Sequence, residues 1–141
     1  MRWDFFMQYW LIKSEPYKYA WEQLKKDGWT YWDGVRNYQA RNFLKQMLTG
    51  DLCLYYHSNE GKEVVGIAEV IKPAYQDPTI EDDRWVAVDV KPYKSLKRNV
   101  GLKEIKATPE LEQMVLVNNS RLSVQPVKPK EFDVILKLSE T

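Results

Sequence analysis

The chain has 141 residues, 44% of them hydrophobic, and its 21 basic and 20 acidic side chains leave a net charge of +1. This length suits a single domain spanning residues 1–141, and the apolar content excludes an intrinsically disordered chain. The near-neutral charge argues against a protein that coats nucleic acid duplexes without specificity. The single cysteine excludes an internal disulfide and a cysteine-based zinc site.

The composition also bears on location and ligand class. No apolar run is long enough to span a bilayer, and MRWDFF before Met7 is too short and too polar for a signal peptide. We therefore expect a soluble protein without a membrane partner, cytoplasmic or, in a eukaryote, nuclear. Six tryptophans and nine tyrosines are many for this length, and rings beyond those that a core needs are what planar ligands stack on.

The N-terminal part predicts a strand and a short helix. Gln8–Lys13 is rich in strand-forming residues and runs into Ser14–Glu15–Pro16, where proline ends strand pairing. Ala20–Lys26 predicts a helix with Trp21 and Leu24 facing inward.

Residues 32–59 predict a turn, a helix and a strand around which the rest of the chain is organised. Asp33–Gly34 favours a tight turn with positive φ. The next segment has apolar residues at the spacing of one buried helix face, namely Ala40, Phe43, Leu44, Met47 and Leu48. Gly50 is a suitable left-handed cap, and the strand Leu52–His57 follows. Polar clusters flank this helix and strand, which predicts a pocket with Trp32 at its mouth.

The second half predicts further strands and short helices. Asn59–Glu60–Gly61 supplies a hairpin turn before a strand at Lys62–Lys72, in which Gly66 marks a bulge or a close backbone approach. Pro73–Asp83 reads as an acidic, solvated connection. The remaining elements are a strand at Trp85–Val90 that Lys91–Leu96 extends, helical pieces at Leu102–Ala107 and Pro109–Met114, a strand at Arg121–Val127 and a helix at Pro129–Leu138. This order predicts an α+β fold around a partly closed barrel.

Catalytic motifs are weak in this sequence. Cys53 and His57 share a strand face but lie about 13 Å apart, beyond hydrogen-bond reach, so Cys53 is expected to be a buried, inert thiol. No G-x-S-x-G motif accompanies the serines that a hydrolase would need near His57, namely Ser14, Ser58 and Ser123. One histidine and one cysteine do not suffice for a transition-metal site, and the acids of residues 77–83 lack calcium-loop spacing. We expect neither a metal nor another cofactor.

Binding chemistry remains, and each candidate has a structural alternative. Trp32 is either a stacking surface or a core tryptophan. Arg36 and Asn37 either present forked donors to a base edge or a phosphate, or act as a salt-bridge donor and a helix cap. The polar run His57–Ser58–Asn59 follows an apolar strand, and its histidine either lies at a pocket rim or is hydrogen-bonded within the structure.

Basic residues gather in two stretches. Residues 34–50 contain no acid and carry Arg36, Arg41 and Lys45, while residues 91–106 carry six basic residues against Glu104. The first group either forms an electrostatic approach for a phosphate backbone or belongs in part to a solvated helix face. Arg121 and Ser123, on one face of a predicted strand, either converge on the pocket or face water.

Six segments together resemble one known family: YWLIKSEP (9–16), WDGVRNYQARN (32–42), GDLCLYYHSN (50–59), VGIAEV (65–70), AYQDPT (74–79) and SRLSVQPV (120–127). They are similar to the EVE domain family of the PUA-like superfamily. The resemblance runs from about Tyr9 to Leu138 and leaves the first six residues outside. It departs from the family at Lys18–Tyr19, where a serine or threonine often caps the first helix.

The resemblance implies a PUA-like mixed β-barrel with peripheral helices, related to YTH domains, which bind methylated adenine in an aromatic cage. It implies a nucleic-acid-binding module, without known catalytic activity, that reads a modified base in DNA or RNA. A base enters a pocket only when it is single-stranded or flipped out of a duplex. The residues carried over to the base pocket are Lys13, Ser14, Trp32, Val35, Arg36, Asn37, Tyr56, His57, Ser58, Asn59, Arg121 and Ser123. An enzyme acting on a nucleotide or nucleic acid, with His57 as acid or base, is the alternative.

Overall fold

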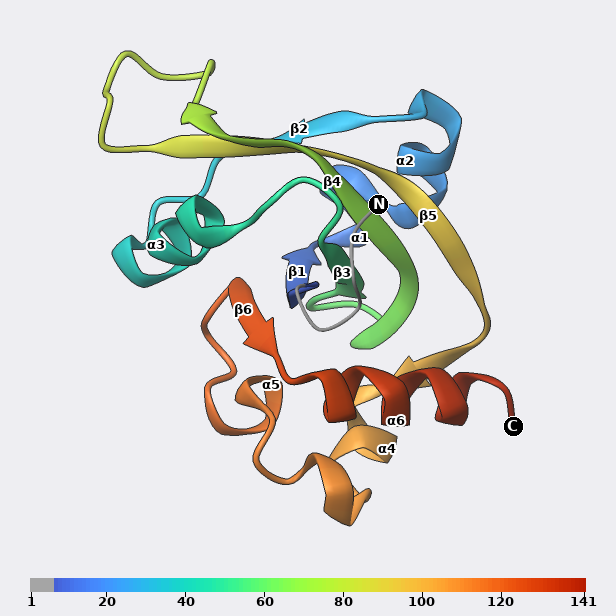
Figure 1. The fold of residues 1–141 in the computed structure, drawn as a ribbon. Helices are drawn as coiled ribbons and strands as arrows, with labels where there is room; N and C mark the ends of the chain where they lie inside the picture. Colours follow the sequence, from blue (N-terminus) through green and yellow to red (C-terminus); the bar gives the residue numbers. More distant parts are fainter. Residues whose placement is uncertain (1–6) are drawn as a thin grey trace.

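The computed structural model describes residues 7–141, so the N-terminal MRWDFF and the expectations attached to it lie outside the described residues. The described strands form one six-stranded sheet in the order β2-β5-β4-β3-β1-β6 (Figure 1). They are β1 (Tyr9–Ser14), β2 (Thr30–Trp32), β3 (Leu52–His57), β4 (Glu63–Gln76), β5 (Val86–Gly101) and β6 (Val124–Val127). Strand β1 pairs parallel with β3, and the other pairs are antiparallel.

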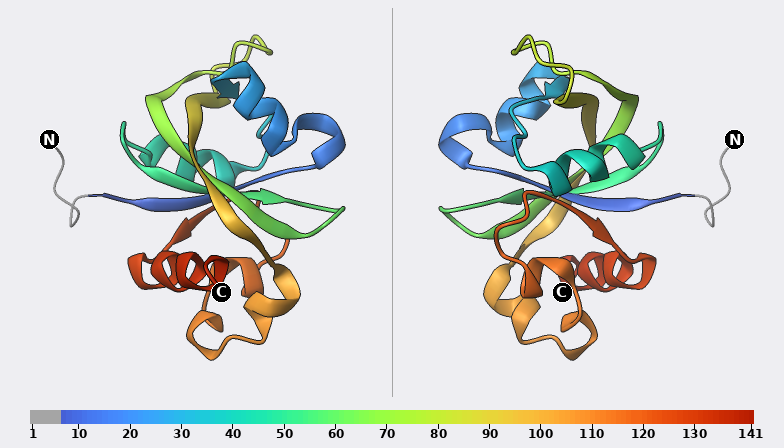
Figure 2. Two further views of the ribbon diagram at one scale, coloured as in Figure 1. Left: turned by 90° about the vertical axis from the view of Figure 1, so that its right-hand side faces the viewer. Right: turned by 90° about the vertical axis from the view of Figure 1, so that its left-hand side faces the viewer.

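Helices cover both faces of this sheet. They are α1 (Pro16–Tyr19), α2 (Trp21–Asp27), α3 (Tyr38–Gln46), α4 (Leu102–Lys106), the 3-10 turn η2 (Pro109–Leu111), α5 (Val115–Asn118) and α6 (Pro129–Ser139). Helices α2 and α3 lie on one side and α4 to α6 on the other, so the sheet forms the middle layer (Figure 1, Figure 2). In residues 7–141 no helix combines the length and apolar character needed to cross a membrane.

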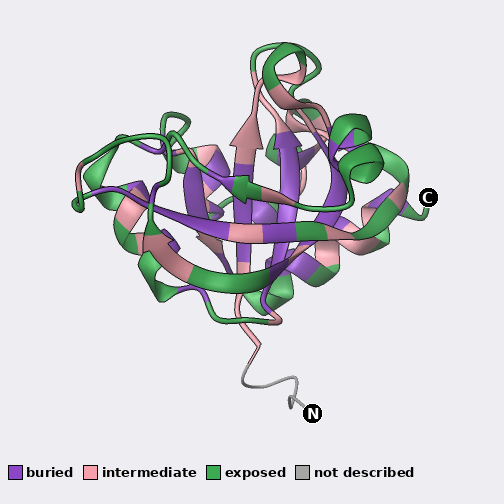
Figure 3. Ribbon diagram, turned by 90° about the horizontal axis from the view of Figure 1, so that it is seen from above, coloured by how far each residue is buried: buried purple, intermediate pink, exposed green. Residues whose placement is uncertain are grey.

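The core has two parts, one on each face of the sheet. Side chains of β3 alternate between them, with Cys53 and Tyr55 in the part beneath α2 and α3, and Leu54 and Tyr56 in the part beneath α4 to α6. Because both faces are covered, β3 is buried along almost its whole length. Seen from above, the buried stretches lie mainly in the central strands, while the loops and the outer part of β5 are largely exposed (Figure 3).

The predicted α+β class is confirmed, but the described strands do not close into a barrel. Strands β2 and β6 are the two edges of the sheet and are not paired with each other. Helix α3 packs against both β5 and β6, so a helix occupies the place that a closing strand pair would need. The barrel expectation is therefore corrected to an open mixed sheet.

Several predicted elements are present with shifted ends, while α1, β2 and α5 were not predicted and β5 continues beyond the predicted Leu96 to Gly101. The bounds of β3 are as predicted, whereas β4 continues through Pro73 to Gln76 and shortens the acidic connection. Helix α3 ends at Gln46 because Met47 is already extended, which leaves Met47 buried and turns Leu48 outward with 55% exposure. Gly50 does have a positive φ of 95°, but in the turn before β3 and not as a helix cap.

Gly66 allows the sheet and α2 to pack closely. The pairing of β4 with β5 shifts register next to Gly66, as the bulge prediction required. A Cβ atom at this position would lie 2.3 Å from Cε2 of Trp21, a distance that real Cβ contacts do not reach. Both readings of this glycine, the bulge and the close approach, are confirmed.

Substituting alanine at Gly66 tests this contact. Gly66→Ala should lower the free energy of unfolding by about 1–3 kcal/mol, because the new methyl group displaces the buried Trp21 ring. Chemical denaturation followed by tryptophan fluorescence measures the change. Gly101→Ala is the matched control, since no atom lies within 4 Å of the Cβ it would add, and its change should stay within about 0.5 kcal/mol. Equal losses in the two variants would contradict the contact.

Candidate functional site

A cleft of about 810 Å³ opens where β1 and β3 end. Parallel strands end at the same edge of a sheet, so Ser14 and Ser58 come together there. The end of β2 with the loop 33–37 forms a second wall, and the segment 120–123 before β6 forms a third. The cleft is therefore built from segments that are far apart in the sequence.

Most of the predicted pocket residues line this cleft: Lys13, Ser14, Trp32, Val35, Arg36, Asn37, Ser58, Arg121 and Ser123. The prediction missed Tyr19, Thr30 and Tyr31, which also line it. Strand β2 has three residues, too few for a recognisable alternating pattern, so its contribution to the wall left no clear signal in the sequence. Tyr19 belongs to α1, a four-residue helix that the sequence did not predict.

Tyr56 and Asn59, two further predicted pocket residues, lie away from this cleft. Successive strand residues point to opposite faces, so Tyr56 lies in the core part beneath α4 to α6, and its neighbour Tyr55 faces the other way. Asn59 is exposed in the β3–β4 loop with a φ of 65°, and its amide donates to the carboxylate of Glu15. Neither side chain lines the cleft.

His57 is hydrogen-bonded within the structure, the second of its two predicted alternatives, and does not line this cleft. Its Nε2 accepts a hydrogen bond of 3.1 Å from the backbone N–H of Trp21, the first residue of α2. That N–H has no partner within its own helix, so the imidazole satisfies it. Burial lowers the pKa of His57, although Glu63 and Glu22 act in the opposite direction. The neutral ring is thus a structural acceptor, and the structural alternative for His57 is the one the geometry supports.

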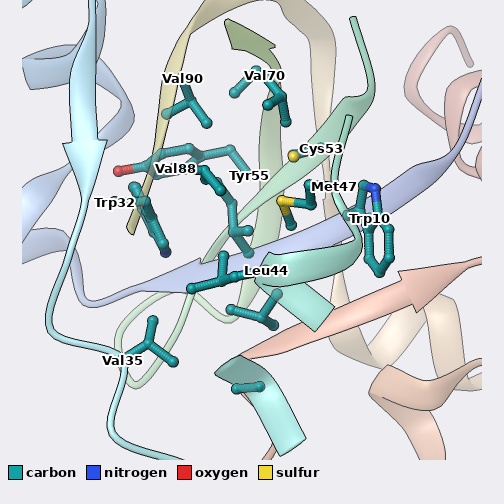
Figure 4. Close-up of a cluster of buried hydrophobic side chains, with 14 of the residues drawn as sticks. Trp10, Trp32, Val35, Leu44, Met47, Cys53, Tyr55, Val70, Val88 and Val90 are labelled. Atoms are coloured by element: carbon teal, nitrogen blue, oxygen red, sulfur yellow. The ribbon is translucent and has the colours of Figure 1, made fainter. Parts of the chain in front are cut away.

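Trp32 is both a core residue and part of the cleft wall. The side chain is 8% exposed, and its ring meets Tyr55 edge-on at a centroid distance of 5.4 Å (Figure 4). Valines of β5 such as Val88 pack in the same part of the core. Of the two alternatives for Trp32, the structure shows the core tryptophan, and the same ring also forms part of the cleft wall.

Arg36 and Asn37 take the structural roles that their sequence position left open. The Asn37 side chain caps α3 by accepting from the N–H of Ala40 at 2.9 Å. Arg36 donates through Nη1 to Oδ2 of Asp77, also at 2.9 Å. The Arg36 side chain keeps 36% exposure and lines the cleft, so the ion pair fixes a guanidinium at the cleft wall.

Asp77 joins the cleft wall to the connection between β4 and β5. The solvated loop predicted here is wrong for Asp77, which is fully buried. Its Oδ2 accepts from the N–H of Gly34 at 2.9 Å and from Arg36, while its Oδ1 accepts from the N–H and the hydroxyl of Thr79. Burial alone would raise the pKa of Asp77, but the bonds from Thr79, Gly34 and Arg36 lower it to about 2.

Lys13 attaches the third wall to β1. Its backbone N–H donates to the carbonyl of Ser123 at 3.0 Å, and its Nζ donates to the carbonyl of Ser120 at 2.7 Å. Arg121 lies between these two anchor points, in the segment before β6 and not on the strand as predicted. Burial lowers the pKa of Lys13. Arg121 and Ser123 were predicted either to converge on the pocket or to face water, and both line the cleft.

The charged side chains lining the cleft leave a positive excess. The basic ones are Lys13, Lys18, Arg36 and Arg121, and the acidic ones are Glu15 and Asp33, an excess of two positive charges. Lys18 pairs with Glu15 at 3.4 Å, whereas Arg121 has no ion-pair partner within residues 7–141. The cleft thus favours a ligand with negative charge.

The remaining predicted groups lie outside the cleft. Arg41 donates to Asn42 and to the carbonyl of Arg84, and neither Arg41 nor Lys45 lines the cleft. Cys53 is buried in the core, and burial raises the pKa of its thiol. Over residues 7–141, histidine, cysteine, aspartate and glutamate side chains form no group of three or more that suits a metal ion.

Comparison with known proteins places these features in a family. Residues 8–138 match the family model of the EVE domain. Mouse Thymocyte nuclear protein 1 is 38% identical over an alignment 167 residues long, and this alignment spans 94% of this chain and 74% of that protein. Human THYN1, solved in complex with DNA containing 5-methylcytosine, is 36% identical with a TM-score of 0.88, covering 95% of this chain and 98% of that one.

A more distant structure shares the fold alone. The YTH domain of the Zygosaccharomyces rouxii MRB1 protein, solved with N6-methyladenosine RNA, has a TM-score of 0.64 at 21% identity. It covers 99% of this chain and 90% of that one.

Removing the charge of Asp77 should weaken the link between the cleft wall and the β4–β5 connection. Asp77→Asn should lower the free energy of unfolding by about 1–2 kcal/mol near pH 7. The pKa of Asp77 is lower in the folded protein than its ordinary value of 3.8, so this contribution is present above that value and is lost as the pH falls toward about 2. Urea titrations at several pH values should therefore show the two proteins converging under acid conditions.

Thr79→Val is the control for Asp77→Asn. It removes a hydroxyl that donates to Oδ1 and leaves both contacts of Oδ2 in place. Thr79→Val should cost less than Asp77→Asn and should not abolish the acid dependence. A constant gap between wild type and Asp77→Asn at all pH values would show that the carboxylate charge is not the link.

The hydrogen bond to His57 predicts a second pH dependence. Its pKa is lowered in the folded protein, so protonation opposes folding, and the contribution of His57 is lost as the pH falls below about 6.5. His57→Ala should cost about 1 kcal/mol at neutral pH, the usual value of a helix-capping acceptor. The difference from wild type should shrink on acidification, which thermal unfolding at graded pH measures. A His57 pKa above its ordinary value, read by NMR, would contradict the acceptor role.

Proposed function

Because this chain belongs to the EVE domain family, we propose that it is a nucleic-acid-binding module whose cleft holds a modified or flipped-out nucleobase. One observation carries the proposal. The cleft brings hydroxyl groups, cationic donors and an aromatic wall together at the ends of β1 and β3. The complex of human THYN1 with DNA containing 5-methylcytosine supports the same ligand class.

The dimensions and chemistry of the cleft suit a base with its sugar and phosphate. Its volume of about 810 Å³ lies within the range of roughly 300–1,000 Å³ that small ligands occupy. Hydroxyl groups of Ser14, Ser58 and Ser123 are polar partners for a base edge, since each can donate or accept. A base still paired within a duplex cannot enter, so the ligand is single-stranded or flipped.

Each wall has a distinct role in this proposal. Trp32, held against Tyr55, offers a rigid aromatic surface for the base. Arg36, held by Asp77, offers a donor whose position is set before the ligand arrives. Arg121 meets a phosphate next to the base, because it lines the cleft and is free of ion pairs within residues 7–141. Arg36 from the cleft wall, and Arg41 and Lys45 from outside the cleft, attract the phosphate backbone.

The proposal describes binding without turnover. The enzyme alternative depended on His57, whose Nε2 accepts from the Trp21 N–H and which does not line the cleft. Acid–base catalysis requires such a group within hydrogen-bond reach of the reacting atom. The name of the mouse relative, a nuclear protein, agrees with a nucleic acid inside the cell as the ligand.

A paired titration tests the function. Short single-stranded oligonucleotides with one central cytosine or one central 5-methylcytosine are added to the protein, and tryptophan fluorescence is followed. We expect saturable binding with a preference for the methylated strand, and no change in the strand by mass spectrometry. Equal and weak binding of both strands, or product formation, would contradict the proposed function.

Arg121→Ala should weaken oligonucleotide binding about 3- to 10-fold without shifting the melting temperature, because an exposed charged donor is lost and no internal contact is broken. Lys130→Ala is the matched control, since Lys130 is an exposed residue of α6 that does not line the cleft. Fluorescence titration and thermal unfolding of both variants measure the effect. If Lys130→Ala lost as much affinity, the effect of Arg121→Ala would come from net charge alone and would contradict a specific role for Arg121.

A further inference from the structure

A second cleft lies at the start of α4. It encloses about 330 Å³ and is lined by Gly61 and Lys62 of the β3–β4 loop and by Gly101, Leu102, Lys103 and Lys106. The base-binding role proposed above makes no use of it. Four of its six lining residues come from the second basic stretch of the sequence, residues 91–106, and no residue of that stretch lines the main cleft.

The lining of this second cleft is cationic and contains no acid. Lys62, Lys103 and Lys106 are exposed, and none of them forms an ion pair within residues 7–141. The nearby acids are engaged elsewhere, since Glu104 pairs with Arg98 at 2.9 Å and Glu63 accepts from Asn99 at 2.9 Å. Three positive charges around a hollow attract an anion.

The backbone holds the three lysines in a defined arrangement. The N–H of Leu102 donates to the carbonyl of Lys62 at 2.8 Å, which fixes the β3–β4 loop to the start of α4. Lys62 has a φ of 47°, a left-handed conformation that is uncommon for lysine. Lys103 and Lys106 are three residues apart on α4, so their like charges lie near each other on one side of the helix. A bound anion would offset the repulsion between them.

The second cleft is connected to the main one by a short loop. Ser58 lines the main cleft, and Lys62 follows four residues later, so their Cα atoms are at most about 14 Å apart. Stacked nucleotides repeat at roughly 3.4 Å along a single strand, so this span corresponds to about four nucleotides. A strand with one base in the main cleft is long enough to bring a phosphate to these lysines.

We propose that Lys62, Lys103 and Lys106 form a phosphate-binding site for the backbone of the strand whose base occupies the main cleft. This inference rests on the proposed function, because the same strand must occupy both clefts. Glu60, exposed in the connecting loop, opposes the passage of the strand. Its neutralisation therefore provides a test in the opposite direction.

A length series tests the site. Oligonucleotides of one to about eight nucleotides, each with the preferred base, are titrated into wild type and into the triple variant Lys62→Ala/Lys103→Ala/Lys106→Ala. Wild-type affinity should rise with length up to about four or five nucleotides, and this gain should be lost in the triple variant. The log–log salt dependence should fall by about 2, since each single-strand phosphate contact contributes about 0.7. Glu60→Gln should raise the affinity of the longer strands.

Controls separate this site from general charge and from the proposed function. Lys26→Ala/Lys130→Ala/Lys137→Ala removes three exposed charges outside both clefts, and an equal loss of affinity there would overturn the site. Inorganic pyrophosphate is the second probe, and binding tighter than that of the oligonucleotide would assign the cleft to a free phosphate compound and overturn the backbone role. The one-nucleotide ligand should bind wild type and triple variant equally, and its failure to bind wild type would instead refute the base-binding function.

Discussion

The parallel pairing of β1 with β3 is the constraint on which the rest of the structure depends. Parallel neighbours need a long crossover, and residues 15–51 provide it with α1, α2, β2 and α3. The crossover covers one face of the sheet, and the helices after β5 cover the other. Because β1 and β3 run in the same direction, their carboxyl ends lie next to each other, and the main cleft forms there.

Burial and binding share the same residues in this cleft. Trp32 and Tyr55 belong to the core, yet Trp32 is also part of the wall. The buried carboxylate of Asp77 works in the same way for the polar wall, because it satisfies the N–H of Gly34 and orients the exposed end of Arg36. A site whose polar and aromatic groups are fixed by the core loses little freedom when a planar ligand binds. This rigidity is the physical basis of the proposed recognition.

The fold also determines where positive charge remains available at the surface. The net charge of the whole chain is only +1, but the lining of each cleft has a positive excess, because many acids are used within the fold. Asp77 holds the wall, Glu104 is paired with Arg98, and Glu63 accepts from Asn99. Composition alone therefore understates how strongly an anionic polymer would be attracted at particular places.

The sequence by itself determined the class of fold, the bounds of β3, the positive φ of Gly34, the close packing at Gly66 and the family, because these depend on local periodicity, turn chemistry and motif. Only the tertiary structure decided which polar residues meet. Because strand residues alternate between faces, Tyr56 points away from the cleft. His57 accepts a hydrogen bond from the first N–H of α2, and Arg36 pairs with the buried Asp77 of a distant loop. Such partners are separated by many residues, and a pattern of neighbours along the chain carries no information about them.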